Sequence, residues 1–332
     1  HVARMLLGRG ARVRVLLRPQ SRLTALEGLP VEKVYGDLRN PESLGPAVEG
    51  VDRLFHVAAD YRLGALNPQE IYDANVAGTR NLLEAARRAG VRRIVVTSSV
   101  ATMAVERGNT LPNETTDSRL EEMIGHYKRS KFLAEKEALK AAREGMPVVV
   151  VNPTTPVGPG DWKPTPTGRI LVDFLNGRMP AYVETGLNWV PVEDVAQGHW
   201  IAAECGRVGG RYILGGRNML LKEILDLLAR ISGRPSPRIR LPHGVAMAAG
   251  YADQFFSRAL NRQPRIPLEG VRMARHKMFV DCSKASDELG FKAGSVEAAL
   301  ERAVAWYEQN GYARHYGATT ANFGQAAQGA GR

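Results

Sequence analysis

The sequence of 332 residues lacks long hydrophobic runs and has very little cysteine. A helix that crosses a bilayer needs roughly 20 consecutive apolar residues, and no stretch approaches that length. A basic-then-apolar leader that ends in a small-residue cleavage site is not recognisable either. We therefore expect a soluble, cytoplasmic protein with no integral membrane segment.

The two cysteines, Cys205 and Cys282, are far apart in the sequence and have no paired histidines nearby. This spacing excludes a zinc cluster and gives no disulfide framework, so no metal site is expected. Free cysteine is among the most buried residue types, which predicts that both are small core residues.

The net charge is +11, from 45 basic and 34 acidic residues. Nucleic acid is the obvious partner for such a charge. However, the basic residues are scattered along predicted helices, and no aromatic-interleaved basic stretch or zinc knuckle accompanies them. The pattern favours a solvated surface that attracts anionic ligands, and no nucleic-acid partner is expected.

Short apolar strands alternate with helical patterns along the first half of the chain. Strands are predicted at 12–17, 31–35, 53–57, 93–97 and 148–151, and helices at 21–27, 41–48, 68–89 and 117–143. Strands that are separated by helices form a parallel sheet that is covered on both faces. The sequence therefore predicts an α/β fold with a doubly wound (Rossmann) parallel sheet.

The beginning of the chain departs from this order. Residues 1–9 already have the apolar stripe of a helix, and Gly10 ends it. A doubly wound sheet begins with a strand and a glycine-rich turn that lead into this helix. We therefore expect the sheet to lack its first strand, which lies in roughly fifteen residues before His1. The position between the strands at 12–17 and 53–57 is then unfilled. A fold that starts with a helix is the alternative.

The regular alternation fades after Val151. Proline and glycine cluster between 153 and 168, as is typical of a loop over a site. Further helices are predicted at 169–176, 192–204, 220–232, 244–260 and 295–310. We expect a dinucleotide-binding domain at 1–152, a smaller, mostly helical substrate lobe at 153–316 with returns to the core, and a disordered tail at 317–332.

Two motifs in the first half carry chemistry. Tyr127 and Lys131 stand four residues apart at the start of a predicted helix and share one face. A neighbouring ammonium stabilises tyrosinate, so Lys131 is expected to lower the pKa of Tyr127 toward neutrality. The strand at 93–97 leads into Ser98 and Ser99 at the carboxyl edge of the sheet, where such sheets bind ligands. Ser99 is predicted to hold a substrate oxygen. Taken alone, either motif also fits an exposed helix face or a turn.

These motifs resemble the extended short-chain dehydrogenases, the NAD-dependent epimerase/dehydratase family, across nearly the whole chain. The matching stretches are GDLRNPESL (36–44), HVAA (56–59), NVAGTRNLLEAA (75–86), VVTSSVAT (95–102), YKRSK (127–131), VNPTTPVGPGD (151–161) and NWVPVEDVAQGH (188–199). Segments such as HVAADYRLG and RYILGG resemble the hopanoid-associated sugar epimerases, and also the dihydroflavonol reductases.

The resemblance implies roles for individual residues. Ser99, Tyr127 and Lys131 match the catalytic triad of the family. The residues that match cofactor-contacting or cofactor-supporting positions are Asp37, Leu38, Val57, Ala58, Ala59, Asn75, Thr97, Tyr127, Lys131 and Pro153. Substrate contacts are implied for Asn152 and Asn188.

The residue at the end of the strand at 12–17 determines whether such a fold prefers NAD or NADP. An acidic residue at this position binds the ribose hydroxyls of NAD and repels a 2′-phosphate. This chain has Arg18 there, with Arg22 one turn onward. Because a guanidinium offers a bidentate fork to phosphate, we expect NADP as the cofactor, with NAD as the alternative. A surface arginine without a ligand is the other interpretation.

The resemblance implies an NAD(P)-dependent enzyme that transfers hydride at a carbinol or carbonyl carbon. The first expectation is a sugar epimerase of the hopanoid-associated type, and the alternative is a carbonyl reductase similar to dihydroflavonol reductase. Dehydration is disfavoured because the family's dehydratases carry Asp-Glu after the threonine that Thr97 matches. A dinucleotide sensor without catalysis and a membrane-surface binder stay open. Expected partners are a nucleotide sugar, a sugar or a hydroxylated lipid head group, with a homodimer as an option.

Overall fold

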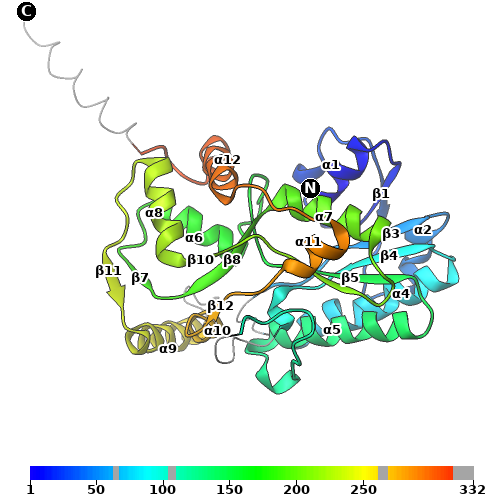
Figure 1. Cartoon of the computed structure of the whole chain (residues 1–332), viewed down its shortest axis with the longest axis horizontal. Coiled ribbons are helices and arrows are strands. Elements are labelled where there is room, and N and C mark those ends of the chain that lie inside the picture. Colours follow the sequence, from blue (N-terminus) through cyan, green and yellow to red (C-terminus); the bar gives the residue numbers. More distant parts are fainter. Residues whose placement is uncertain (63–66, 104–109, 261–267, 317–332) are drawn as a thin grey trace, which may run out of the picture.

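The computed structural model describes residues 1–62, 67–103, 110–260 and 268–316, and the predicted tail at 317–332 lies outside them. The first half alternates strands and helices as the sequence predicts (Figure 1). Its strands are β1 (Val13–Leu17), β2 (Val31–Tyr35), β3 (Arg53–His56), β4 (Arg93–Thr97) and β5 (Val148–Pro153). Its α-helices are α1 (Val2–Gly8), α2 (Gly45–Val48), α3 (Gln69–Tyr72), α4 (Gly78–Arg88) and α5 (Gly125–Arg143).

The strands of this half pair in parallel, as predicted for a doubly wound fold. β3, β4 and β5 form one sheet in that order, and β9 (Arg211–Leu214) returns from the second half to pair with β5. β1 and β2 form a separate parallel pair. Among the described residues, β1 pairs only with β2 and β3 only with β4. The position that we expected to be unfilled between β1 and β3 holds no described strand.

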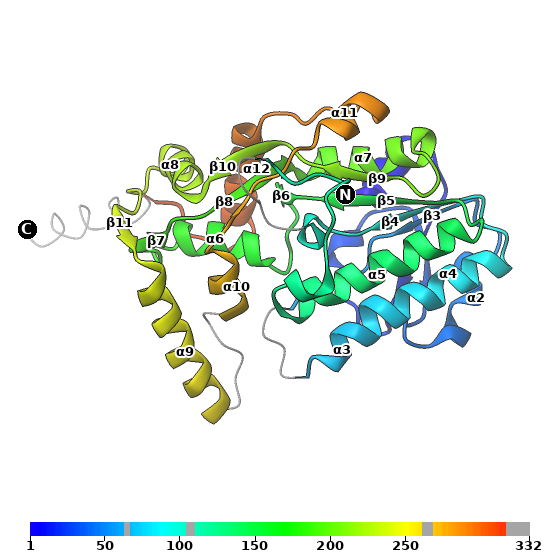
Figure 2. The same cartoon turned by 60° about the horizontal axis from the view of Figure 1, so that its bottom comes forward.

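Helices cover both faces of the central sheet. Figure 2 shows α4 and α5 on one face and α7 (Val192–Cys205) on the other. β5 is buried along its whole length, and the three inner residues of β4 are also buried. Their near-continuous valine and isoleucine runs suit strands that have no solvent-facing side.

The second half packs three helices around a strand. α6 (Pro166–Leu175), α8 (Leu221–Ser232) and α12 (Val296–Gln309) surround β8 (Gly186–Pro191), whose Trp189 is fully buried in the shared core. The remaining helices are α9 (His243–Ala259), α10 (Leu268–Met273) and α11 (Ser283–Leu289). None of the helices in the described ranges has both the length and the apolar character that a bilayer span requires.

The second half also contains strands that the sequence did not reveal. They are β6 (Thr155–Val157), β7 (Ala181–Val183), β10 (Arg217–Leu220), β11 (Ile239–Leu241) and β12 (Lys277–Met278), in addition to β8 and β9 given above. All of them except the six-residue β8 have two to four residues, which is too short for a period of two to stand out. This part of the chain therefore mixes strands and helices more evenly than predicted.

Three other expectations differ from the structure. The helix predicted at 21–27 is only a 3₁₀ turn at Thr24–Leu26. The long helix predicted at 68–89 is interrupted by a π-helical turn at Asp73–Ala77. Cys205 is exposed and Cys282 is half-buried, so neither is a core residue. Cys205 is the last residue of α7, where the helix reaches the surface.

Candidate active site

The candidate site lies at the carboxyl edge of the central sheet. Because β3, β4 and β5 are parallel neighbours, the residues that follow them meet at one edge. The backbone N–H of Ser98 donates to the carbonyl of Val151 at 2.8 Å, which continues the β4–β5 pairing beyond Thr97. Ser99 is thereby held beside the end of β5.

Helix α5 presents its chemical groups on the face that meets this edge. Tyr127 and Lys131 lie one turn apart, and Glu135 follows after another turn. A side-chain hydrogen bond joins Tyr127 to Ser99, and the ammonium of Lys131 donates to the carbonyl of Thr97 at 2.7 Å. The three residues of the predicted triad are therefore together at the end of β4.

The protonation of this group differs from the sequence-based expectation. Burial raises the pKa of Tyr127, and the hydrogen bond with Ser99 opposes that rise. The expected lowering by Lys131 is not seen, because burial dominates the shift. Burial lowers the pKa of Lys131 to about 8, although the charge of Glu135 acts in the opposite direction. Lys131 is thus still mostly charged at neutral pH.

A buried histidine fixes the side chain of Thr97. The pKa of His199 is lowered to about 4, mainly by burial, so the ring is neutral at neutral pH. Its Nδ1 lies 2.7 Å from the carbonyl of Val195 and must carry the proton. Nε2 then accepts from the hydroxyl of Thr97 at 2.8 Å. Thr97 was predicted to contact the cofactor, but its hydroxyl is used here by His199, which the sequence reasoning missed.

The side-chain amide of Asn152, which was predicted to contact substrate, donates to the buried carboxylate of Glu135. The side chain of Asn152 is fully buried and donates to Oε2 of Glu135 at 2.6 Å. Thr102 donates to the same oxygen at 2.9 Å, and Nε of Arg211 lies 3.1 Å from Oε1. The amide nitrogen of Asn152 is therefore used by Glu135, because a buried carboxylate needs donors, and the substrate contact of Asn152 stays a prediction. Sequence reasoning also missed Glu135, although its spacing from Lys131 is a signal.

Asn188 is likewise used inside the protein. It is 1% exposed, and its amide donates to Asn218 Oδ1 at 2.8 Å. Its Oδ1 accepts from the N–H of Gly216 at 2.8 Å. These bonds join β8 to Asn218 of β10 and to Gly216 just before that strand, and the substrate contact of Asn188 stays a prediction.

The backbone strip after β3 is open to solvent. Val57, Ala58 and Ala59 are exposed directly after the buried His56. Asn75 accepts from the N–H of Asp60 at 2.7 Å and donates to its carbonyl at 2.8 Å. The same amide donates to Ser130 of α5 at 2.9 Å. The strip that was predicted to lie along the dinucleotide is thus braced against the helix that carries Tyr127.

Three residues that were predicted to contact the cofactor, Arg18, Asp37 and Leu38, follow β1 and β2. The guanidinium of Arg39 holds both oxygens of Asp37 and lowers the pKa of that carboxyl to about 2, with a smaller contribution from the charge of Arg18. Arg18 itself is exposed. Leu38 contacts α4 so closely that a Cβ on Gly78 would lie 2.8 Å from its own Cβ. Pro153, which was also predicted to contact the cofactor, is the buried last residue of β5.

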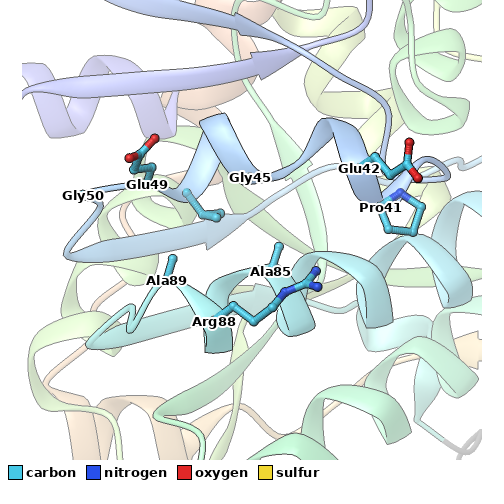
Figure 3. Close-up of a pocket in the computed structure, with 9 residues that line it drawn as sticks. Pro41, Glu42, Gly45, Glu49, Gly50, Ala85, Arg88 and Ala89 are labelled. Atoms are coloured by element: carbon cyan, nitrogen blue, oxygen red, sulfur yellow. The ribbon is translucent and has the colours of Figure 1, made fainter.

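Two hollows differ in their relation to this edge. The larger one lies between α2 and α4, away from the candidate residues (Figure 3). A smaller cavity lies next to Ser99 and Tyr127 and is lined by Val100, Met103, Pro112, Lys128, Met278, Phe279 and Val280. Lys128 is 6% exposed, with its ammonium 3.8 Å from the sulfur of Met278. An apolar cavity with one buried cation therefore adjoins the candidate triad.

Comparison with known proteins agrees with this geometry. Residues 1–215 match the family described as the NAD dependent epimerase/dehydratase family. A putative dihydroflavonol 4-reductase from Synechocystis sp. is 43% identical over 95% of this chain and 92% of its own length. Sterol demethylase protein B from Methylococcus capsulatus is 38% identical over 94% of this chain and 95% of its own length.

Solved structures lead to the same group. The crystal structure of a nucleoside-diphosphate-sugar epimerase from Pseudomonas aeruginosa has a TM-score of 0.78 and 27% identity, and the match covers 94% of both chains. The sequence match, the structural match and the triad at the sheet edge are mutually consistent. The chain belongs to the NAD-dependent epimerase/dehydratase family of enzymes.

Proposed function

We propose that this enzyme transfers a hydride between NADP and a secondary carbinol or carbonyl carbon. The observation that carries the proposal is the meeting of Ser99, Tyr127 and Lys131 at the end of β4. The dinucleotide fits beside the exposed strip at 57–59 and, when bound, supplies or accepts the hydride. A substrate oxygen that lies against Tyr127 can accept its phenolic proton during reduction or return it during oxidation.

Each residue of the triad then has a distinct task. Ser99 donates a hydrogen bond to the substrate oxygen and orients it toward the phenol. Tyr127 moves the proton, and its raised pKa keeps the phenol protonated at neutral pH, as reduction requires. Lys131 places a positive charge below the end of β4 and is available for a ribose hydroxyl of the cofactor. The braces through Asn75 and His199 keep the groups in position.

The choice of NADP rests on Arg18. Its exposed guanidinium stands after β1, near the carboxylate of Asp37, which Arg39 already neutralises. The guanidinium of Arg18 could donate two hydrogen bonds to a 2′-phosphate here, and the neutralised Asp37 would repel that phosphate only weakly. NAD remains the alternative cofactor, because the family name specifies only NAD.

The finer activity that we propose is sugar epimerisation of the hopanoid-associated type, in the cytoplasm. In that reaction the ketone turns over and the hydride returns to its other face. The second candidate is net carbonyl reduction, which the name of the Synechocystis relative favours.

Deuterated NADPH tests the proposal and separates the two candidates. The protein is incubated with nucleotide sugars, or with hydroxylated polycyclic lipids, and the products are analysed by mass spectrometry. Deuterium that transfers to product in proportion to cofactor oxidised indicates reduction. Inverted product in a parallel incubation with NADP⁺, which accepts the hydride in the first step, and without net change of the cofactor indicates epimerisation. Tight dinucleotide binding without turnover of any substrate would indicate a non-catalytic dinucleotide sensor and contradict the proposal.

A further inference from the structure

Helix α9 presents an apolar face to solvent. Its exposed apolar side chains are Val245, Ala248, Ala249, Tyr251, Ala252, Phe255 and Phe256, and the exposed Leu260 follows its last residue. Phe255 is 70% exposed and Leu260 is 67% exposed. These positions recur every three or four residues, so they form one stripe along the helix. Figures 1 and 2 place α9 at the edge of the second half, with α10 beside it.

The polar residues of α9 lie on its other side. Asp253 and Gln254 are half-buried, and Ser257 is 1% exposed. Gly250 faces α10 so closely that a Cβ there would lie 2.8 Å from a methyl carbon of Leu268. A helix that covers a protein core has the reverse arrangement, with its apolar side inward. The stripe is therefore a surface that suits an apolar partner.

The segment of the sequence that contains the stripe is rich in basic residues. Residues 234–277 contain nine Arg or Lys and only two acidic residues, so this segment holds +7 of the total charge of +11. Arg238, Arg275 and Lys277 are exposed, and Arg272 contacts the hydroxyl of Tyr251 at 3.4 Å. Both acids are turned toward the protein: Asp253 lies on the inner side of α9, and Glu269 accepts from the N–H of His126.

We propose that α9 and these basic residues dock the enzyme on an anionic lipid bilayer. The aromatic stripe would enter the boundary between head groups and acyl chains, and the arginines and lysine would bind the head groups. Charge argues against a second copy as the occupant, because apposed stripes would bring two +7 segments together. It equally favours negatively charged lipid over neutral lipid.

Docking in this orientation would bring the catalytic helix to the bilayer. Glu269 of α10 contacts the start of α5 at His126, one residue before Tyr127. α10, which packs beside the stripe-bearing α9, therefore contacts the first turn of the helix of the proposed proton donor. This step rests on the proposed function and assigns the substrate to amphiphiles that reside in the membrane. The docking itself does not depend on which reaction the enzyme performs.

Vesicle co-sedimentation tests the docking. The protein is expected to sediment with vesicles of phosphatidylcholine and phosphatidylglycerol, much less with phosphatidylcholine alone, and less as salt rises. Phe255→Asp should lower the vesicle partition coefficient at least about tenfold, because one aromatic side chain leaving water is worth about that factor. Arg275→Gln combined with Lys277→Gln should weaken binding to the mixed vesicles only. Val208→Asp, at a 46% exposed site between α7 and β9, is the matched control and should bind normally.

The outcomes separate docking from its alternatives. Absence of sedimentation with the mixed vesicles overturns the proposal, and so does equal binding by the Phe255→Asp protein. A dimer in sedimentation velocity that Phe255→Asp dissociates would identify a second copy as the occupant. Phe256→Asp serves if Phe255→Asp shifts the thermal melting curve. Retained dinucleotide binding and turnover of a soluble substrate by both variants would show that docking can fail or hold independently of the catalytic assignment.

Discussion

The pair β1–β2 and the pair β4–β5 are both parallel and rich in valine and leucine or isoleucine, yet they are buried to very different degrees. No residue between 1 and 43 is buried, whereas all six residues of β5 are. β5 has β4 on one side, β9 on the other and helices over both faces. β1 has hydrogen-bonded contact with β2 alone among the described strands. Apolar composition alone therefore does not bury a strand. Burial also requires neighbouring strands on both sides and helices over both faces.

The two regions also divide the proposed chemistry. Groups that move the proton are anchored to β4 and α5, in the buried part. The residues proposed to select the dinucleotide, Arg18 and Asp37, follow β1 and β2 in the exposed part. Substitutions in the two regions should therefore have separable effects on turnover, stability and cofactor preference.

The largest effect is expected at Tyr127. Tyr127→Phe removes the phenolic proton but keeps the ring, so kcat should fall at least about a hundredfold while the melting temperature changes little. Tyr35→Phe, at a 52% exposed residue of β2, is the control and should leave kcat unchanged. Steady-state kinetics check both. A loss of less than about tenfold in Tyr127→Phe would remove this residue from the proton-transfer role.

Matched valine substitutions measure the burial difference itself. Val150→Ala, at a fully buried site in β5, should lower the free energy of unfolding by about 2–3 kcal/mol, because it removes two methyl groups and leaves a cavity. Val15→Ala, at a partly exposed site in β1, should cost less than about 1 kcal/mol. Chemical denaturation gives both values. Equal losses would mean that β1 is as well covered in solution as β5.

Cofactor preference should respond in the exposed region alone. Arg18→Asp is expected to shift the NADP-to-NAD ratio of kcat/KM about 10- to 100-fold toward NAD, because it exchanges a phosphate fork for a repelling carboxylate. Arg12→Asp changes an exposed arginine directly before β1, at the opposite end of the strand from Arg18, and should leave the ratio unchanged. Wild-type protein that already prefers NAD would refute the phosphate role of Arg18.

The smallest effect concerns the pH dependence of the Asp37–Arg39 pair. The folded pKa of Asp37 is about 2, below its ordinary value of 3.8, mainly through Arg39. A depressed carboxyl pKa contributes stability that is present above pH 3.8 and is lost as the pH falls through about 2. Screening at this partly exposed site reduces the contribution to about 1 kcal/mol. Asp37→Asn should destabilise the protein by that amount at pH 7 in denaturation curves, and the difference from wild type should shrink toward pH 2.

The sequence predicted local patterns well and side-chain partnerships poorly. The strands at 31–35 and 93–97 agree with β2 and β4 at both ends, because the sequence pattern is strong over five residues. The spacing of Tyr127 and Lys131 needed only helix geometry to be correct. Asn152 could not be placed, because its direction depends on Glu135, seventeen residues away on another element. The reversed face of α9 was also hidden, since periodicity locates an apolar stripe but does not tell which side faces the protein.

The π-helical turn at Asp73–Ala77 sets the phase between the two α-helical segments that it joins. An α-helix advances about 100° per residue, and the wider turn accommodates one residue that an unbroken helix would lack. Ile71 before the turn and Leu82 after it are both buried. Deleting one residue from 73–77 would restore an ordinary helix and rotate one segment against the other by about 100°. The relative rotation of the two α-helical segments therefore depends on the number of residues in the turn and not on the identity of any side chain.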